Sequence, residues 1–456
     1  MFKTNDLSLA LWKKAIKDSN YYLIANIGSR FVGFLALPFV ARMLPVEEFG
    51  KYDIFILVSS FISLFLTLGI DSGIAIFIAE KRKDKHILSS LYTFEQVITI
   101  TLFLLLLGTF IACYPFLTSS NSFIKEYPLD FWLKTGIYAL LITIIYNGFN
   151  FLRYLEKACI ASLNNFISSF LGVILGLLLL FYYSRKEVNY FINGMLMGNL
   201  LGLCITLIFT KKYITTNFFK NNKKLFKELL WVSIPFLPNY LSNRFMQMVD
   251  RIVILSLFTS YELGLYAGIM RIAVIPMVIL GSVAAGFLPV MYNNYQSKEG
   301  RRFIANVFHF YLFFLLLSVA VVSVLDKYLV QLIIGEKFIK VSHLLPVALA
   351  AFMLINCSQL SGFGYSIKRR TMYIFPITLG AISINFIASF LLAKFIGLSG
   401  VALGTLIAGV FRSSIYIYGS ERLYRFGYSW KFFWGIVALV LFFSLVTQKI
   451  LCFIYK

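Results

Sequence analysis

Long runs of apolar residues, separated by short polar segments, dominate the pattern along the chain. A helix needs about 20 apolar residues to cross a bilayer, so each run is long enough for one span. The runs lie at residues 21–42, 53–78, 91–112, 132–151, 159–182, 190–210, 230–256, 264–290, 303–325, 343–365, 371–393, 399–419 and 432–453. Gln448 and Lys449 interrupt the last run. The pattern predicts an all-α integral membrane protein with 12 transmembrane helices, or 13 if the last run also spans.

The composition agrees with this fold class. Apolar residues make up 59% of the chain and charged residues 14%, with a mean hydropathy of +0.82. Ordinary soluble domains carry about 25% charged residues. The loops between the runs are short, so the sequence predicts no extramembrane catalytic domain.

The distribution of lysine and arginine predicts the orientation. Basic residues are concentrated at residues 81–85, 211–212, 220–227, 298–302 and 368–370. Cytoplasmic loops of membrane proteins collect lysine and arginine. This rule places the N-terminus and these segments in the cytoplasm. It also accounts for the net charge of +22 without a nucleic-acid partner.

The chain contains an internal repeat. The sequence EFGKY at residues 48–52 recurs as ELGLY at residues 262–266, which is an offset of 214 residues. The same offset relates Arg30 to Arg244, and both arginines lie deep inside apolar runs. Transporters are often built from such repeats around a central binding site. The repeat predicts two six-helix lobes around a central cavity.

The basic segment between the sixth and seventh runs marks the expected boundary between the lobes. We predict an N-terminal lobe at residues 1–210, a cytoplasmic linker at 211–229, and a C-terminal lobe at 230–420. Residues 421–456 form a C-terminal segment with the optional thirteenth span.

Glycines recur at every fourth residue in the fifth and sixth runs. They lie at Gly172 and Gly176, and at Gly194, Gly198 and Gly202. Small residues at this spacing let two membrane helices approach closely. We expect these glycines to serve close helix packing.

Ionisable residues at membrane depth are the candidate functional residues, because a charge there is costly. The set comprises Arg30, Asp71, Glu95, Arg244, Asp250, Arg251, Arg271 and Arg412. The planar fork of arginine suits phosphate oxygens. We therefore expect Arg30, Arg244, Arg271 and Arg251 to bind an anionic substrate.

Ion pairing between packed helices is the alternative role for these charges. Asp71, Asp250 and Arg412 are the candidates for such pairing, and Asp250 adjoins Arg251 in the chain. For Arg30 and Arg244 the repeat favours a position that lines the cavity.

The sequence contains no constellation for enzyme chemistry. Its 5 cysteines form no C-x-x-C motif, its 3 histidines are scattered, and no Walker A motif is present. We expect no catalytic residues, no bound metal and no cofactor.

Two segments resemble the conserved motifs of a known family. Residues 41–52, ARMLPVEEFGKY, resemble the motif of polysaccharide flippases of the O-antigen type. These proteins belong to the multidrug/oligosaccharidyl-lipid/polysaccharide exporter superfamily. Residues 250–255, DRIVIL, followed by ELGLYA at 262–267, look like the matching segment of the second lobe.

The resemblance implies a flippase in the cytoplasmic membrane. It implies movement of a polyprenyl-diphosphate-linked oligosaccharide between leaflets by alternating access, with basic cavity residues holding the diphosphate. The implied partners are this substrate, membrane lipids and polysaccharide assembly proteins, and transport is expected to couple to H⁺ or Na⁺. No nucleic acid is implied.

Two other function classes stay open on the residues alone. An exporter of another amphiphile, such as a cationic drug, would favour acids at membrane depth, whereas arginines predominate here. A membrane glycan polymerase or ligase would be expected to carry a long outer loop with catalytic residues, whereas the predicted outer loops are short.

Overall fold

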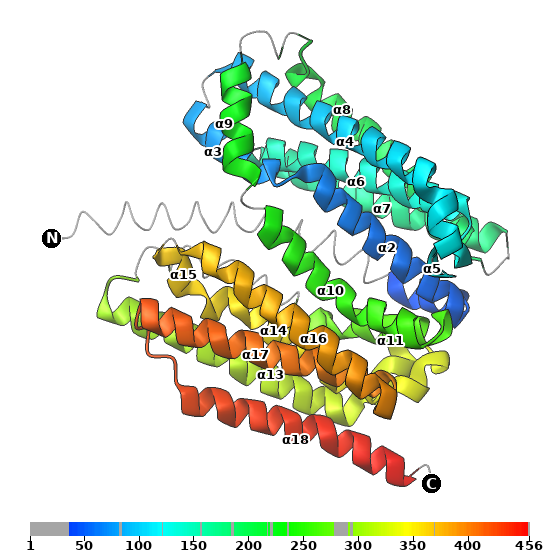
Figure 1. The fold of residues 1–456 in the computed structure, drawn as a ribbon, viewed down its shortest axis with the longest axis vertical. Helices are drawn as coiled ribbons and strands as arrows, with labels where there is room; N and C mark the ends of the chain where they lie inside the picture. The colour runs from blue at the N-terminus through cyan, green and yellow to red at the C-terminus, as the bar shows by residue number, and fades with distance from the viewer. Residues whose placement is uncertain are drawn as a thin grey trace. The chain divides into compact units, whose positions relative to one another are not determined.

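The chain is helical throughout the part that the structure, a computed structural model, describes (Figure 1). The structure describes residues 36–81, 84–120, 122–155, 157–183, 187–216, 218, 222–234, 237–277, 291, 295–368 and 370–454. The all-α class predicted from the apolar runs is confirmed.

The chain divides into two compact units. The first comprises Met1–Leu44 and Lys51–Leu241, and the second comprises Pro45–Gly50 and Ser242–Lys456. The change of unit falls beyond the expected linker at 211–229. The lobe boundaries drawn from the sequence stay a prediction.

The helices of the first unit follow the apolar runs. They are α2 (Val46–Thr67), α3 (Ile70–Lys81), α4 (Lys85–Ser120), α5 (Ser122–Glu126), α6 (Leu129–Tyr154), α7 (Ala158–Tyr182), α8 (Val188–Thr210), the 3₁₀ turn η1 (Lys211–Tyr213) and α9 (Lys223–Ser233). The first residues of α2, up to Gly50, belong to the second unit.

The expected continuous span at 53–78 is broken in the structure. It consists of α2 and α3, separated by Leu68 with φ of 50° and Gly69 with φ of 70°. A positive φ ends the right-handed helical geometry, and only glycine adopts it at little cost. The apolar pattern continues across the break, which is why it predicted one helix.

Helices α7 and α8 pack against each other through their glycines, so the close packing that the spacing predicted takes place between these two helices. A Cβ added at Gly194 would lie 2.4 Å from the Gly176 backbone, and one added at Gly198 would lie 2.3 Å from Gly172 N. Backbone therefore touches backbone along this pair, and no larger side chain fits between the helices.

We expect Gly198→Leu to lower the amount of protein in the membrane several-fold, because its side chain would collide with the Gly172 backbone. Overpacking of this kind costs roughly 1–3 kcal/mol. The measurement is the membrane level of a tagged protein. Gly108→Leu is the matched control, because a Cβ there meets nothing within 4 Å. Equal levels of the two variants would contradict the packing.

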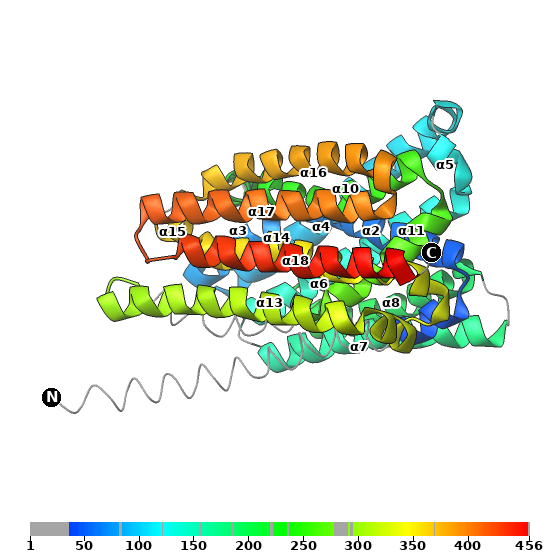
Figure 2. The ribbon, with the colours of Figure 1, turned by 90° about the horizontal axis from the view of Figure 1, so that it is seen from below.

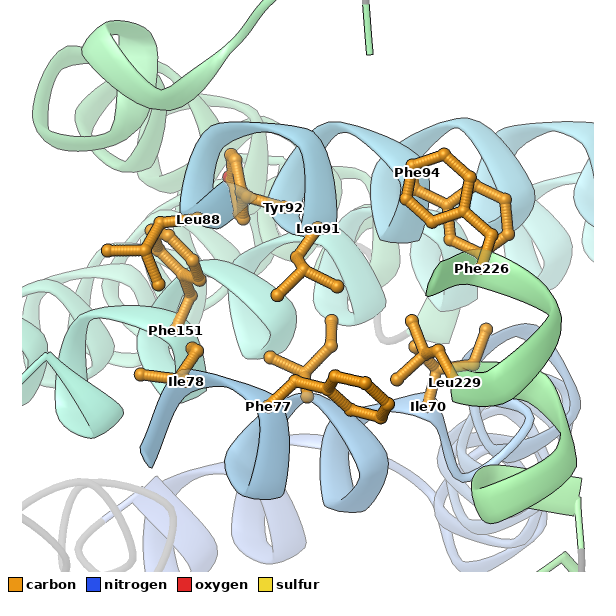
Figure 3. Packing of buried hydrophobic residues seen from close by; sticks show 11 residues of the cluster. Ile70, Phe77, Ile78, Leu88, Leu91, Tyr92, Phe94, Phe151, Phe226 and Leu229 are labelled. Carbon is orange, nitrogen blue, oxygen red and sulfur yellow. The ribbon is translucent and has the colours of Figure 1, made fainter. Parts of the chain in front are cut away.

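Helix α9 is amphipathic and packs on α3 within the first unit. Phe226 and Leu229 are buried against the core around Ile70 and Phe77, and the rings of Phe226 and Phe94 stack with centroids 3.9 Å apart (Figure 3). The lysines of α9 lie on its exposed side. The end of the predicted linker, from residue 223 to residue 229, is thus part of a helix that packs on the first unit.

The second unit contains the remaining helices, except for residues 237–241 at the start of α10, which belong to the first unit (Figure 2). They are α10 (Leu237–Leu257), α11 (Ser260–Ala273), α13 (Lys298–Ile333), the 3₁₀ turn η3 (Glu336–Val341), α14 (Leu344–Ser361), α15 (Phe363–Ile367), the 3₁₀ turn η4 (Thr371–Tyr373), α16 (Ile374–Ile396), α17 (Leu398–Leu423) and α18 (Trp430–Ile454). Helix α17 packs against both α14 and α16.

The two copies of the repeated motif meet inside the second unit. A Cβ added at Gly50 would lie 2.6 Å from the Ser260 carbonyl oxygen, and one added at Gly264 would lie 1.9 Å from the Val46 carbonyl oxygen. Val46 and Ser260 are themselves 214 residues apart. Each glycine therefore admits the backbone at the start of the other copy, which explains why both copies carry glycine at this position.

Nine helices in the described part are long and apolar enough to cross a membrane, and Trp430–Ser444 is a shorter apolar helix. Helix α10 does not qualify, because Arg244, Asp250 and Arg251 interrupt its apolar surface. The run at 432–453 is helical as α18, so the thirteenth segment exists as a helix.

Candidate functional site

A cavity of about 350 Å³ lies within the second unit. Its walls come from α10, α14 and α17, with single residues from α15 and α16. Two of the charged residues singled out in the sequence, Asp250 and Arg412, line it. The cavity thus places an acid and a base on the surface of one pocket.

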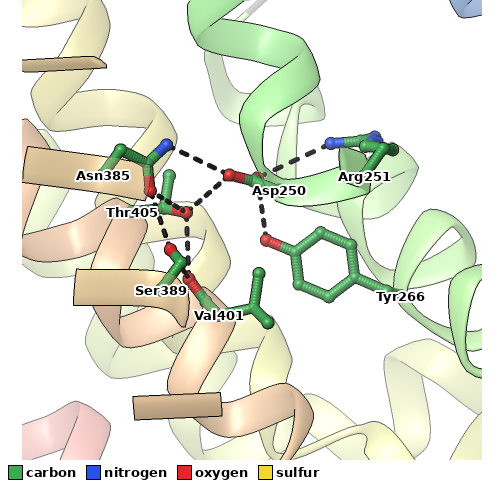
Figure 4. Close-up of polar contacts among 7 residues, drawn as sticks. All are labelled: Asp250, Arg251, Tyr266, Asn385, Ser389, Val401 and Thr405. Carbon is green, nitrogen blue, oxygen red and sulfur yellow. Dashed lines mark hydrogen bonds and ion pairs between the residues drawn. The ribbon is translucent and has the colours of Figure 1, made fainter. Parts of the chain in front are cut away.

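Asp250 is 2% exposed and accepts hydrogen bonds from three helices (Figure 4). The Thr405 hydroxyl donates to Oδ1 over 2.9 Å, and Asn385 Nδ2 donates to Oδ1 over 3.1 Å. The Tyr266 hydroxyl donates to Oδ2 over 2.9 Å. These donors offset part of the cost of burying a carboxylate.

Further oxygen atoms surround this carboxylate. The Ser389 hydroxyl donates to Asn385 Oδ1 over 2.9 Å, and the hydroxyls of Ser389 and Thr405 reach the Val401 carbonyl oxygen at 3.2 and 3.0 Å. We call Asp250, Asn385, Ser389, Thr405 and the Val401 carbonyl the Asp250 cluster. It combines a carboxylate, an amide, hydroxyls and a carbonyl, which are oxygen ligands that suit a hard cation or a proton.

Arg251 lies beside the same carboxylate. Its Nη1 is 3.6 Å from Asp250 Oδ2, and its guanidinium lies 5.6 Å from the centroid of the Tyr266 ring. The structure therefore brings together Asp250 and Arg251, for which the sequence allowed both ion pairing and substrate binding.

Arg412 lies at another part of the cavity wall. Its Nη2 donates to Asn243 Oδ1 over 2.7 Å, and its guanidinium lies 5.5 Å from the centroid of the Tyr416 ring. An ion pair was one expectation for Arg412. Among the described residues, its polar partner is the neutral amide of Asn243.

The other predicted substrate-binding arginines differ in their surroundings. Arg244 is exposed, and its Nη1 donates to Oε1 of Gln247, a residue that lines the cavity. Arg271 is half-buried, with its guanidinium 5.0 Å from the centroid of the Phe49 ring. Arg30 lies outside the described residues.

Asp71 belongs to the first unit. It is buried, and the Tyr146 hydroxyl donates to its Oδ2 over 3.1 Å. Glu95, on α4, is also buried. These acids are therefore separate from the Asp250 cluster.

The described residues contain no group of three or more His, Cys, Asp or Glu side chains that could hold a metal ion. The oxygen atoms around Asp250 come from one carboxylate and from neutral groups, so they are not such a group of His, Cys, Asp or Glu side chains.

Reasoning from the sequence missed three members of the cluster, namely Asn385, Ser389 and Thr405. A signal was present, because Asn385 and Ser389 are four residues apart and share one face of an otherwise apolar helix. Neutral polar residues are common between membrane helices, so this signal is weak without a structure.

Comparison with known sequences identifies a family and several relatives. The family described as "Polysaccharide biosynthesis protein" matches residues 15–294. The "Capsular polysaccharide biosynthesis protein CapF" of Staphylococcus aureus is 24% identical over 428 residues, which is 90% of this chain and 100% of that protein. The "Lsg locus putative protein 1" of Haemophilus influenzae is 25% identical over 297 residues, covering 63% of this chain and 68% of that protein.

Comparison with solved structures shows the fold. The lipid II flippase MurJ, in an inward closed conformation, aligns with a TM-score of 0.66 at 16% identity, covering 96% of this chain and 98% of that chain. An inward-facing multidrug resistance MATE family transporter of the MOP superfamily aligns with a TM-score of 0.64 at 15% identity, covering 89% and 95%. The chain therefore has the fold shared by these transporters.

Proposed function

The chain belongs to the polysaccharide biosynthesis protein family, and from this membership we propose that it is a flippase for lipid-linked polysaccharide units. It moves polyprenyl-diphosphate-linked oligosaccharide units across the cytoplasmic membrane for assembly of a surface polysaccharide such as an O-antigen. The observation that carries the proposal is that a chain of this family has the fold of a lipid II flippase. A carrier with alternating access needs no catalytic residues or cofactor.

The arginines at membrane depth support an anionic lipid-linked substrate. A diphosphate diester carries about two negative charges, and arginine forms charge-assisted hydrogen bonds to such oxygens that are roughly twice as strong as neutral ones. We assign this contact to Arg30, Arg244, Arg271 and Arg251. The assignment rests on their depth in the sequence and, for Arg30 and Arg244, on the repeat.

The Asp250 cluster supports coupling to a cation, either H⁺ or Na⁺. Asp250 is a buried carboxylate with Thr405 and Asn385 on one oxygen, and the other oxygen lies 3.6 Å from Arg251 Nη1, so a cation would compete with Arg251 for its negative charge. A proton or a sodium ion bound there changes the charge of α10. A transporter can use such a change to bias one of its conformations, because a ligand shifts an equilibrium by its differential affinity for the two states.

Deletion of the gene in its own host tests the function. We expect surface polysaccharide to disappear while the lipid-linked precursor is still made and accumulates. The measurement combines staining of intact cells with extraction of lipid-linked glycan. Failure to make the precursor would instead assign the protein to glycan assembly, and unchanged surface polysaccharide together with altered drug tolerance would favour export of another amphiphile.

The orientation is tested by cysteine labelling. We propose that the N-terminus and α9 face the cytoplasm, because α9 and the loop before it are rich in lysine. In a background without native cysteines, Lys125→Cys is expected to react with an impermeant maleimide added to intact cells. Lys224→Cys is expected to react only after permeabilisation. Both side chains are exposed in the structure. Labelling of Lys224→Cys in intact cells would refute this orientation.

A further inference from the structure

Arg412 is a buried cation that lacks a charged partner among the described residues. It lies near the middle of α17 and is 5% exposed. Its Nη2 donates to Asn243, while its Nε is buried and has no hydrogen-bond partner within the part of the chain that the structure describes. Leaving a charged donor buried and unsatisfied is energetically costly. A cation kept in this state inside a membrane protein indicates a ligand site.

The acid in the same cavity does not neutralise Arg412. Asn243 and Asp250 are seven residues apart on α10, as are Thr405 and Arg412 on α17. Hydrogen bonds join Asn243 to Arg412 and Asp250 to Thr405, so two polar pairs, which we call rungs, connect the two helices. Seven residues of helix span about 10 Å. The rung with the acid and the rung with the arginine are therefore separate positions along one cavity.

The cavity wall around Arg412 suits a sugar. Gln247, Asn356 and Ser358 contribute amides and a hydroxyl, and Tyr416 contributes an aromatic ring. Asn356 Nδ2 and the Ser358 hydroxyl each donate to a backbone carbonyl of their own helix, and their side-chain oxygens can accept from sugar hydroxyl groups. The volume of about 350 Å³ falls in the range of small-molecule pockets, which is roughly 300–1,000 Å³.

The charge of the site indicates which sugar. A single guanidinium matches a single negative charge, and its planar fork matches a carboxylate in a two-point hydrogen bond. We propose that Arg412 binds the carboxylate of an acidic sugar in the glycan that the protein moves. This inference rests on the proposed function and adds the substrate class to it. A diphosphate, which carries about two charges, is the other anion in such a substrate.

Binding of simple probes to the purified full-length protein tests the proposal. We expect glucuronate to raise the melting temperature saturably in the wild type, and glucose at the same concentrations to have no comparable effect. Arg412→Gln is expected to weaken glucuronate binding at least tenfold. Arg422→Gln is the matched control, because Arg422 lies on the same helix and is exposed. It should bind glucuronate like the wild type.

A second variant covers the case in which Arg412→Gln does not fold. Arg412→Lys keeps the buried charge and loses the planar fork, and we expect it to bind glucuronate several-fold more weakly than the wild type. Equal binding by the wild type and these variants would overturn the proposal, as would equal binding of glucose and glucuronate. Binding of pyrophosphate that depends on Arg412, without binding of glucuronate, would assign the subsite to the diphosphate and refute the sugar.

These outcomes are separable from failure of the proposed function. The binding measurement does not involve transport. Glucuronate binding that does not depend on Arg412 would refute the proposed subsite without contradicting flippase activity. Normal surface polysaccharide in the deletion strain would refute transport of the glycan, whatever Arg412 binds.

Discussion

Replacing Asp250 with asparagine is expected to abolish surface polysaccharide export while the protein stays in the membrane. The amide can still accept from Thr405 and Asn385, so the packing of α10, α16 and α17 changes little. What disappears is the negative charge that the proposed coupling cation would need. Export is measured by staining intact cells, and it is normalised to the membrane level of the protein.

Two comparisons separate the charge from the hydrogen bonds. Tyr266→Phe removes one donor to Asp250 and keeps the carboxylate, so we expect it to retain a substantial part of the export. Asp130→Asn is the control for loss of an acid, because Asp130 is an exposed residue paired with Lys134. Wild-type export by Asp250→Asn would exclude a cation site at this carboxylate.

Replacing Arg244 with alanine is expected to lower export at least about tenfold at unchanged protein level. A hydrogen bond to a charged group contributes about 1.5–3 kcal/mol, and 1.4 kcal/mol corresponds to tenfold. Arg244→Lys keeps the charge but loses the fork, so we expect it to retain part of the activity. The equivalent changes at Arg30 should behave in the same way, because the repeat relates the two residues.

The control and the competing explanation for Arg244 are both measurable. Arg302→Ala removes an exposed arginine from the first turns of α13 and should leave export near the wild-type level. If export by Arg244→Ala falls only in proportion to a fall in membrane protein, the arginine anchors a helix and does not bind substrate.

Much of the helical framework could be predicted from the sequence, because apolar length and glycine spacing are local properties. The runs at 132–151, 159–182 and 190–210 became α6, α7 and α8, and Gly194 and Gly198 meet the glycines of the neighbouring helix as expected. The repeat of EFGKY as ELGLY also has a structural counterpart, since Gly50 and Gly264 each receive backbone from the start of the other copy.

The break at Leu68 and Gly69 could not be predicted, because hydropathy carries no information about φ. The Asp250 cluster could not be predicted for a different reason. Asn385 and Thr405 are 20 residues apart in sequence and more than 130 residues from Asp250, so only tertiary packing brings them together. Neutral polar residues in apolar helices have many structural uses, and the sequence does not show which of them share a partner.

Arg412 illustrates the limit of reasoning from charge alone. Its depth indicated ion pairing or function, and both remained open in the sequence. The structure decides which described groups it touches, namely the Asn243 amide and the Tyr416 ring within a cavity. These neutral partners make a ligand site testable.

Translocation by the purified protein tests the central claim most directly. The protein is reconstituted into liposomes that contain a fluorescent polyprenyl-diphosphate-linked oligosaccharide, and a glycosidase added outside reports how much substrate is accessible. In protein-free liposomes about half of the substrate should stay protected. With the wild-type protein and an imposed H⁺ or Na⁺ gradient, we predict that the protected fraction shifts within minutes, and that Asp250→Asn and Arg244→Ala do not shift it. A protected fraction that the wild-type protein leaves unchanged under either gradient would contradict the account.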